Sequence, residues 1–530
     1  MSRAETRSGQ PSSLRPRRLS GIALSKLLAT VGLSPPNEPA GAPKITGVTA
    51  DSRLVHPGDL YVAAPGATAH GADYAGEAFD LGAVAVLTDA GGREQILTDT
   101  GREPPTPVTV TANPRHHVPA LAAEVYRHPS ARLRLFAITG TNGKTTTAYL
   151  FQAALRAAGH HVGLIGTIGF QLDECRLETR RTTVTTPEPA ELSALLAVMA
   201  EGGADTVVME VSSHALALGR VDGLVFDVAA FTNFGSDHLD FHSDLESYFA
   251  AKASLFTAER ARQAVVNVDD GRGEELVRQA WREGLSIRSV SLNGAADYTT
   301  LRRRRAARGR TAVTAGTPAG PVEFTLELPG EFNVRNALTA LAMADLAGAD
   351  LGRAADGLAA AVVPGRMQRV DLGAGAPAVF VDFAHTPQAV SAALASLAGH
   401  RRIVVLGCGG DRDPDKREPM GAAAAAQAEL VVVTDDNPRT EDPRAIRASI
   451  LAGATAEAGR GRRDVTVVDG GPRPDAIAVA LASAGPEDVI AVLGKGHERG
   501  QEVAGKMLPF ADDDAIREIW RRLSLSGERG

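Results

Sequence analysis

Cysteine and long apolar runs are both scarce in this sequence. Its 530 residues include only two cysteines. Cys175 and Cys408 stand far apart and outside any metal-ligand spacing, so we predict neither a disulfide framework nor a zinc site. No stretch approaches the roughly 18 consecutive apolar residues that a membrane-spanning helix requires. We therefore expect a protein without a membrane span, in a reducing, cytoplasmic compartment.

Positive charge is not in excess either. The 63 aspartates and glutamates outnumber the 56 lysines and arginines, and the net charge of -7 predicts no nucleic-acid partner. Local basic groups and backbone N–H donors must therefore hold any anionic substrate. Six arginines fall within residues 302–310, between hairpin-like signals, which is typical of a solvated loop. Residues 1–18, rich in Arg, Ser and Pro, are typical of a disordered tail.

The length of the chain predicts about three domains. Residues 20–133 mix short strand signals with Gly and Pro turns, which indicates a small α/β domain. In residues 134–363, apolar strands alternate with Ala- and Leu-rich helical segments, which predicts a parallel sheet with crossover helices. The alternation restarts in residues 364–530, which predicts a doubly wound, Rossmann-like domain. The predicted fold class is therefore α/β, in three domains.

A glycine-rich loop lies between an apolar strand and a helix at residues 138–146. Its glycines allow backbone N–H groups to approach phosphate oxygens, Lys144 can reach the β- and γ-phosphates, and Thr145 can offer its hydroxyl to Mg²⁺. Ile138 stands where the general phosphate-loop pattern has its first glycine, so this loop is a shorter variant. The residues predicted to bind ATP here are Gly140, Thr141, Asn142, Gly143, Lys144, Thr145 and Thr146.

Polar residues follow two further predicted strands. Glu210 comes directly after the strand at 206–209, and His238 lies in the polar loop after the strand at 228–231. Open α/β sheets place their ligands at the carboxyl ends of strands, where a carboxylate is a natural Mg²⁺ ligand. Taken alone, Glu210 is equally typical of a surface residue. Lys252, on an amphipathic helix, is by itself typical of a surface lysine whose stem lies along apolar neighbours.

Together these motifs resemble the Mur ligases, ATP-dependent amide-forming enzymes of peptidoglycan synthesis, and the related folylpolyglutamate synthetases. The resemblance extends over essentially the whole chain after the first twenty residues. It is carried by residues 140–146, 210–214, Asn233, Asp237-His238, Lys252, 333–336, Gly365-Arg366, 382–387 and 494–498.

The resemblance implies a metal site built on the central domain. Glu210 and His238 are expected to bind Mg²⁺ together with Thr145, while Lys252 is expected to carry a CO₂-derived carbamate near a second Mg²⁺. Such a carbamate forms from a neutral amine, which an apolar environment favours because it lowers the pKa of a lysine.

The resemblance also implies the reaction. A D-glutamyl γ-carboxylate attacks the γ-phosphate of ATP, and an amine captures the acyl phosphate. Because both reactants of the first step are anions, cations are expected to clamp them. Arg366 is expected at the γ-phosphate, Asn336 at the adenine and Asp382 at the ribose. The expected catalytic residues are Lys144, Lys252, His238 and Arg366.

The expected carboxyl substrate is a UDP-muramoyl dipeptide. The positions that match the family's contacts to it are Ser52, His70, Gly71, Ala72, Thr185, Thr186, Ser212 and Arg220. The substrates are expected to be the only partners, and the protein a monomer.

The amine is indicated by the Asp-Asn-Pro-Arg sequence at 436–439, which follows a predicted strand. A guanidinium can hold a carboxylate through two hydrogen bonds. The far end of meso-2,6-diaminopimelate carries a carboxylate and an ammonium, whereas L-lysine has only the ammonium, so Arg439 should attract the first and repel the second. The family's diaminopimelate-adding branch shows this sequence. The expected contacts are Arg412, Asp436, Asn437, Pro438, Arg439, Gly494 and Glu498.

Several alternatives stay open. Asn-Pro is also typical of an ordinary turn, which would leave Arg439 as a solvated loop residue. The same chemistry with L-lysine and folylpolyglutamate synthesis are the nearest rivals. A nucleotide-dependent regulatory module with a decayed site is a third, which intact Lys144, Glu210, His238 and Lys252 argue against. The glycines at 407–410 do not complete a dinucleotide fingerprint, because Arg412 replaces its third glycine.

Overall fold

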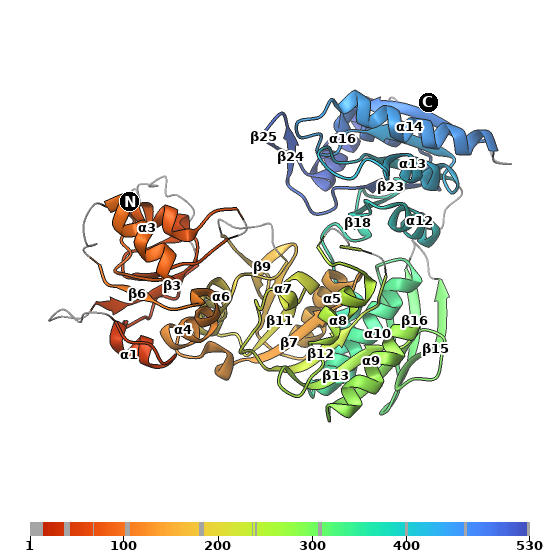
Figure 1. Cartoon of the computed structure of the whole chain (residues 1–530). Coiled ribbons are helices and arrows are strands. Elements are labelled where there is room, and N and C mark those ends of the chain that lie inside the picture. The colour runs from red at the N-terminus through yellow and green to blue at the C-terminus, as the bar shows by residue number, and fades with distance from the viewer. Residues whose placement is uncertain are drawn as a thin grey trace, which may run out of the picture. The chain divides into compact units, whose positions relative to one another are not determined.

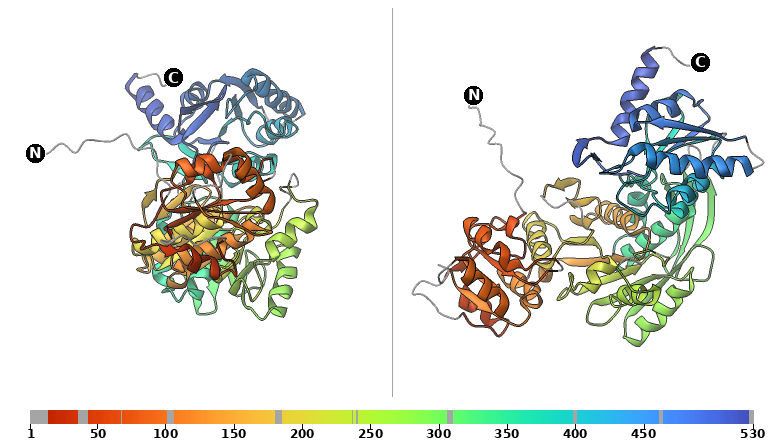
Figure 2. Two further views of the ribbon diagram at one scale, coloured as in Figure 1. Left: turned by 60° about the vertical axis from the view of Figure 1, so that its left-hand side comes forward. Right: turned by 45° about the horizontal axis from the view of Figure 1, so that its top comes forward.

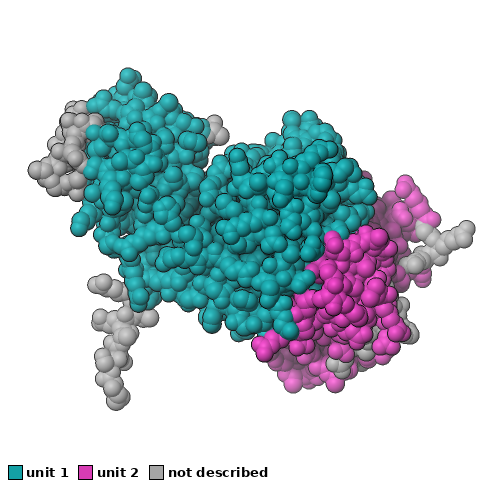
Figure 3. All heavy atoms as spheres, turned by 90° about the horizontal axis from the view of Figure 1, so that it is seen from below, with its two compact units in different colours: residues 1–290, 339–350 teal, residues 291–338, 351–530 magenta. Residues whose placement is uncertain are grey.

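The computed structural model describes residues 14–35, 43–66, 68–100, 106–179, 185–235, 237–238, 241–305, 310–397, 401–460 and 464–526. The chain divides into two compact units, shown in Figure 3. One unit contains residues 1–290 and 339–350, and the other contains residues 291–338 and 351–530. Among the residues described, no helix is long and apolar enough to cross a membrane.

The first unit begins with a four-stranded parallel sheet. Its strand order is β3 (Gly47–Thr49), β4 (Asp59–Ala63), β5 (Ala85–Thr88), β6 (Val108–Val110). The helices of this region are α1 (Leu24–Ala29), α2 (Ala75–Asp80), α3 (Ala90–Thr100) and α4 (Val118–Val125), and a small ribbon pairs β1 (Ile22–Ala23) with β2 (Lys44–Ile45). The core under this sheet also takes in alanines from α6 (Pro189–Glu201), so the N-terminal region packs directly on the central one.

Part of the predicted disordered tail is ordered. Residues 1–13 lie outside the described part of the chain, but Arg15 inserts beside buried Asp59, with a 2.6 Å ion pair, and contacts the Tyr126 hydroxyl. Leu14 packs against the central core, and the Arg17 N–H donates to Glu201 at 2.7 Å. The prediction of disorder is therefore wrong for residues 14–18. Their composition favours disorder, but the ion pair with buried Asp59, which is distant in sequence, holds this segment in place.

The central sheet of the first unit has strand order β10-β9-β8-β11-β7-β12-β13-β14 (Figure 1). These strands are β7 (Arg134–Thr139), β8 (Val162–Gly166), β9 (Gly169–Leu172), β10 (Cys175–Leu177), β11 (Thr206–Glu210), β12 (Phe226–Phe231), β13 (Ala261–Asn267) and β14 (Ser286–Ser291). Beside α6, the helices between them are α5 (Lys144–Ala157), α7 (Ser213–Ala217), α8 (Leu245–Ala253) and α9 (Gly271–Arg282).

This sheet is mixed, whereas the sequence predicted a parallel one. Strands β8, β11, β7, β12, β13 and β14 are parallel, but β9 and β10 run antiparallel at one edge. The reason is the connection from Gly166 to Gly169, which is long enough for a tight hairpin but too short for the crossover that a parallel neighbour requires.

The second unit contains three antiparallel strands, β15 (Tyr298–Arg305), β16 (Thr311–Thr317) and β17 (Gly320–Leu326). Arg302, Arg303 and Arg304 are exposed, but they belong to β15, so the loop predicted for this run is wrong there. Residues 306–309 lie outside the described part. Helix α11 (Leu351–Ala360) packs on β17, and α10 (Glu331–Leu346) passes from this unit into the other.

The rest of the second unit is a six-stranded sheet of order β18-β19-β23-β20-β21-β22, parallel except for β18. Its strands are β18 (Gln368–Val370), β19 (Ala378–Asp382), β20 (Arg402–Leu406), β21 (Leu430–Thr434), β22 (Thr466–Gly471) and β23 (Val489–Leu493), followed by a hairpin of β24 (Gly500–Val503) and β25 (Lys506–Pro509). Two separate cores show that α12 (Pro387–Ser396), α13 (Arg417–Ala425) and α14 (Pro443–Arg460) cover one face, and α15 (Arg473–Ala482) and α16 (Asp512–Ser526) the other (Figures 1 and 2). The doubly wound prediction is confirmed.

One fully buried ion pair joins α15 to α16. The Arg473 guanidinium, with a side chain that is 0% exposed, donates to both carboxylate oxygens of Asp512 at 2.7 and 2.8 Å and to the Leu493 carbonyl at 2.9 Å. Removing one partner of such a pair leaves an uncompensated charge in a low-dielectric core.

We predict that Asp512→Asn lowers the free energy of unfolding of this unit by about 3–5 kcal/mol. The matched control is Asp514→Asn on the same helix, because its ion pair with Arg499 is exposed and such pairs contribute only about 0–1 kcal/mol. Urea unfolding of both variants measures the difference, and equal midpoints would contradict the prediction.

Candidate active site

The glycine-rich loop joins β7 to α5 and is held by the end of β12. Gly140 has φ +142°, and a Cβ there would lie only 2.0 Å from Thr232 Oγ1. The Asn233 side chain accepts from the Asn142 N–H at 3.0 Å and donates to the Asn142 carbonyl at 2.8 Å, while the Thr141 N–H donates to the Asn233 carbonyl. Gly143, at φ +85°, caps α5, where Thr145 and Thr146 are buried in the first turn. The predicted ATP-binding residues of this loop are thus brought together.

Two lysines converge on one carbonyl oxygen of this loop. Lys144 Nζ donates to Gly140 O at 2.8 Å and to Thr141 O at 2.9 Å, and Lys252 Nζ donates to Gly140 O at 2.9 Å. Lys252 is 1% exposed, and its ammonium lies 4.4 Å from the centre of the Tyr248 ring. The surface reading of Lys252 is therefore wrong. Burial, and then the charge of Lys144, lower the pKa of Lys252 well below its ordinary value.

Glu210 is a buried carboxylate at the end of β11. It is 1% exposed and accepts from Thr145 Oγ1 at 2.8 Å, from Thr167 Oγ1 at 3.1 Å and from the Thr167 N–H at 2.9 Å. Each of these donors is neutral. A carboxylate and a hydroxyl beside a phosphate-binding loop fit Mg²⁺, which keeps several waters and takes few protein ligands together with substrate phosphates.

His238 has φ +54° and is partly exposed. Its ring lies edge-on to His214, with centroids 4.8 Å apart, and 6.0 Å from the Tyr248 ring. Across the described residues, no three His, Cys, Asp or Glu side chains are grouped so as to hold a metal ion. Glu210 and Thr145 are thus the predicted metal ligands that the structure joins by a hydrogen bond, and the roles of both, like that of His238, stay predictions.

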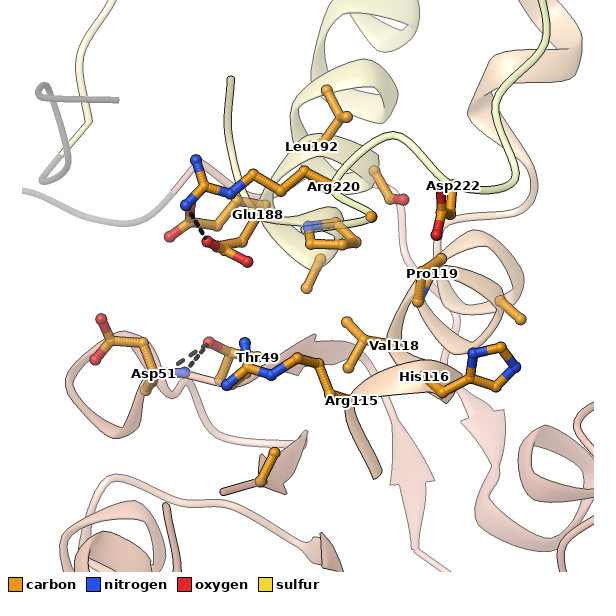
Figure 4. A pocket seen from close by; sticks show the side chains of 18 of the residues that line it. Thr49, Asp51, Arg115, His116, Val118, Pro119, Glu188, Leu192, Arg220 and Asp222 are labelled. Atoms are coloured by element: carbon orange, nitrogen blue, oxygen red, sulfur yellow. Dashed lines mark hydrogen bonds and ion pairs between the residues drawn. The ribbon is translucent and has the colours of Figure 1, made fainter. Parts of the chain in front are cut away.

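A cavity of about 1440 Å³ opens in the first unit, lined by residues of the N-terminal sheet region, α4, α6 and the loop after α7 (Figure 4). Of the predicted substrate residues, Ser52, Gly71 and Arg220 line it. His70 and Ala72 shape its wall indirectly, because His70 Nδ1 accepts from the Ala72 N–H at 3.0 Å and caps a short helical turn.

The other predicted substrate residues gather around Glu210. Thr186 Oγ1 donates to the Glu210 carbonyl at 2.9 Å and accepts from the Ser212 N–H at 3.2 Å, and Thr185 lies 3.1 Å from the hydroxyl of Thr167. Arg220 connects the two groups, since it lines the cavity and donates to the Thr186 carbonyl at 3.2 Å. The structure thus links the cavity to the neighbourhood of the phosphate loop.

Sequence reasoning missed Arg115, a further cation of the cavity. Figure 4 shows Arg115 and Arg220 on opposite sides of it. Arg220 is paired with Glu188 at 2.8 Å and Arg53 with Asp51 at 2.7 Å, whereas Arg115 donates to the Pro65 carbonyl at 3.3 Å. Of the three arginines that line the cavity, Arg115 is thus the one that has no ion pair with a carboxylate of the described residues. Thr167 was also missed, although its place directly after β8, at the carboxyl end of the sheet, was a usable signal.

The predicted nucleotide residues of the second unit lie at two places. Asp382 ends β19 and accepts from the N–H groups of Met367 at 2.7 Å and Ala384 at 2.8 Å. Burial raises the pKa of Asp382, and the charge of Arg366 opposes this. The Arg366 guanidinium lies 4.4 Å from the centre of the ring of Phe383, which is the residue after Asp382. Asn336 is buried on α10, where its amide donates to Asn333 Oδ1 at 3.3 Å.

The predicted amino-acid loop follows β21. Gly494 approaches it so closely that a Cβ would lie 2.4 Å from Asp436 Oδ2, and the Asn437 amide donates to Glu498 Oε2 at 2.8 Å. Pro438 packs against Gly410, where a Cβ would lie 2.0 Å from the Pro438 carbonyl oxygen.

Arg439 is more constrained than its sequence context suggested. It has φ +53°, donates to the Gly410 carbonyl at 2.6 Å and pairs with Glu502 of β24 at 3.3 Å. Arg412 is exposed and flanks the same turn, because a Cβ on Gly409 would lie 3.0 Å from Arg439 NH1 and 3.8 Å from Arg412 Cγ. The sequence did not predict the role of Glu502. Its carboxylate partly neutralises Arg439, the residue that was expected to repel L-lysine.

Comparison with known proteins agrees with this geometry. Residues 44–137 match the family described as "Mur ligase family, catalytic domain", residues 138–344 the "Mur ligase middle domain" and residues 365–506 the "Mur ligase, glutamate ligase domain". The UDP-N-acetylmuramoyl-L-alanyl-D-glutamate--2,6-diaminopimelate ligase of Streptomyces avermitilis is 46% identical over 96% of this chain and 98% of its own. The chain belongs to the Mur ligase family, in its MurE branch. The predicted resemblance is confirmed.

Solved structures of Mur ligases and their relatives share this fold. One described as a UDP-N-acetylmuramoyl-L-alanyl-D-glutamate--2,6-diaminopimelate ligase is 28% identical, with a TM-score of 0.66, and the match covers 95% of this chain and 99% of that one. Folylpolyglutamate synthase of Mycobacterium tuberculosis is 22% identical, with a TM-score of 0.57, over 71% of this chain and 91% of that one. At that identity the second likeness shows the fold alone.

We predict that Gly140→Ala abolishes measurable ATP binding, because the added Cβ has to displace Thr232 or the loop itself. Gly235→Ala is the control, since its Cβ would meet Thr141 at an ordinary 3.8 Å. Isothermal titration with ATP and Mg²⁺ checks both variants. An unchanged affinity in Gly140→Ala would show that this loop does not hold the nucleotide.

Proposed function

We propose that this protein is an ATP-dependent ligase that adds meso-2,6-diaminopimelate to the D-glutamate γ-carboxylate of UDP-N-acetylmuramoyl-L-alanyl-D-glutamate, in cytoplasmic peptidoglycan synthesis. The observation that carries the proposal is the likeness, over 96% of the chain, to the Streptomyces avermitilis enzyme of that name. The protein acts as a monomer, and its partners are its small-molecule substrates.

The first step brings two anions together, the substrate carboxylate and the γ-phosphate of ATP. At 4 Å and an effective dielectric constant of 20, two unit charges repel by about 4 kcal/mol. Lys144 and Arg366 offset this repulsion, and the phosphate loop offers its N–H groups to the phosphates. Mg²⁺ held by Glu210 and Thr145, with His238 and Lys252, would supply further positive charge. Asn336 and Asp382 orient the adenosine.

Lys252 becomes a carboxylate by reaction with CO₂. The burial and lowered pKa of its amine support this, because only the neutral amine is nucleophilic. Carbamylation also replaces one of the two cations at the Gly140 carbonyl by an anion that favours a metal ion.

The UDP end of the substrate lies in the cavity that Ser52, Gly71 and Arg220 line, and its diphosphate pairs with Arg115. Support for this placement comes from Arg115, which lines the cavity and has no ion pair with a carboxylate in the part of the chain that the structure describes. The peptide end then extends toward Thr185, Thr186 and Ser212, which surround Glu210.

Acceptor selection rests on the loop at 436–439. Arg439 binds the far carboxylate of meso-2,6-diaminopimelate, and Glu498 accepts its far ammonium, with Arg412 and Gly494 beside them. L-Lysine is the second candidate acceptor, favoured by Glu502, because the ion pair at 3.3 Å reduces the charge with which Arg439 would repel an ammonium.

The test is phosphate release from ATP and Mg²⁺ with the UDP-muramoyl dipeptide and either acceptor. We expect turnover with meso-2,6-diaminopimelate and a kcat/KM for L-lysine that is at least about 30-fold lower, since a lost charge-assisted pair costs about 2–5 kcal/mol. Preferential turnover with L-lysine would overturn the acceptor assignment, and turnover only with folate substrates would overturn the function.

Lys252→Ala tests the carbamate. We expect this variant to lose activity and to regain part of it when a short carboxylic acid such as acetate is added, because the acid replaces the missing carboxylate. Lys144→Ala is the control, since its lost ammonium is not replaced by an acid. Near wild-type activity of Lys252→Ala without additive would remove the carbamate from the mechanism.

A further inference from the structure

One buried lysine, Lys495, contacts three residues of the proposed acceptor site. Lys495 follows β23, and its side chain is 0% exposed. Its ammonium donates to Asn437 Oδ1 at 3.0 Å and to Glu498 Oε2 at 2.9 Å, and it lies 4.0 Å from Asp436 Oδ1. A buried ammonium needs such partners, because its desolvation is otherwise costly.

The lysine determines which way the Asn437 amide faces. Asn437 Oδ1 accepts from Lys495 and from the Glu502 N–H at 3.0 Å, and its Nδ2 donates to Glu498 Oε2 at 2.8 Å. If the amide were flipped, its NH₂ group would face two donors and its oxygen would face a carboxylate. Asn437 is therefore occupied by internal hydrogen bonds, and it supports the site more than it recognises a ligand.

The same lysine acts on the charge of Glu498. Both internal donors bind Oε2, and the side chain is 35% exposed, so Glu498 can still present a carboxylate oxygen outward. Burial raises the pKa of Glu498, but the charge and hydrogen bond of Lys495, with the Asn437 hydrogen bond, bring it below its ordinary value. Its other charged neighbours are His497, Asp436 and Arg473, and the pKa of Asp436 is itself raised by burial.

The neighbouring charges do not replace this lysine. Arg473 lies near Asp436, but its guanidinium is bonded to both oxygens of Asp512. That pair is neutral as a whole, which leaves Lys495 as the cation bonded directly to Glu498. Arg439, the other cation of the loop, is paired with Glu502.

We propose that Lys495 is the positioning residue of the acceptor site: it orients Asn437 and keeps Glu498 an anion that can receive the far ammonium of the acceptor. The inference rests on the proposed function, and it assigns Lys495 an effect on the acceptor alone. Lys495 touches neither reactant. It acts through Glu498, so its effect depends on pH.

The sign of that dependence follows from the carboxylate. Glu498 binds an ammonium only when ionised, so binding weakens as pH falls through the pKa of Glu498. Removing the cation raises that pKa, because burial is then less opposed, and an opposite charge at this distance is worth about 1–3 pH units. Loss of Lys495 should therefore move the acid limb of acceptor binding to higher pH.

The experiment is the pH profile, from 3.5 to 9, of kcat/KM for meso-2,6-diaminopimelate and of KM for ATP in the full chain, so that the range includes the lowered pKa of Glu498. We expect Lys495→Met to shift the acid limb for the acceptor upward by about 1–3 pH units, while KM for ATP changes less than about twofold. Lys495→Arg should keep the wild-type limb, because it keeps the charge. Lys506→Met, an exposed lysine of β25, is the matched control and should behave like wild type.

A loss that is the same at every pH, or an equal rise in the KM for ATP, would overturn the inference in favour of a purely structural lysine. If Lys495→Met does not fold, two other variants provide the test. The acid limb of acceptor binding must vanish in Glu498→Gln and persist in Lys495→Arg, and any other result overturns the inference. Absence of diaminopimelate-dependent turnover in the wild type would instead overturn the proposed function.

Discussion

The carbonyl oxygen of Gly140 receives hydrogen bonds from the side-chain amino groups of two lysines, Lys144 and Lys252. Like charges this close repel, so the arrangement persists only because the carbonyl lies between them and because Lys252 is buried with a lowered pKa. The close backbone approach depends on the glycine itself, since any side chain would collide with Thr232. An anion arriving here meets the positive charge of Lys144, which is already in place, and such preorganisation favours transfer of a phosphoryl group between anions.

Sheet order explains why the other groups meet this loop. Strand β7 lies between β11 and β12, so the carboxyl ends of its two neighbours flank the loop. Glu210, at the end of β11, accepts a hydrogen bond from Thr145, and Asn233, just after β12, accepts one from the Asn142 N–H. Strand β8 adds Thr167 from one position further out. Three segments separated by tens of residues thus form one site through strand order alone.

In the second unit, too, side chains at the carboxyl ends of strands are held by a buried charged group. At the carboxyl ends of β21 and β23, a buried cation, Lys495, joins Asn437 of the loop after β21 to Glu498 of the segment after β23. The hairpin that follows adds a carboxylate to Arg439 and an N–H to Asn437. In the second unit the partly exposed Glu498 is held by the buried charge of Lys495, so its position depends on a residue that lies behind it.

The sequence by itself determined the fold class, the glycine-rich loop after the first strand of the central domain and the family. These follow from local patterns: alternating strands and helices, glycines at short spacing, and a carboxylate or an Asp-Asn-Pro-Arg stretch directly after a strand. It did not determine the antiparallel edge of the central sheet, the burial of Lys252, the insertion of Arg15 beside Asp59, or the contacts of Thr167, Lys495 and Glu502. Each of these depends on a partner distant in sequence or on desolvation, and the pattern of neighbouring residues contains neither. Only the tertiary structure decided which charges are buried and paired, because burial and pairing arise from packing between elements.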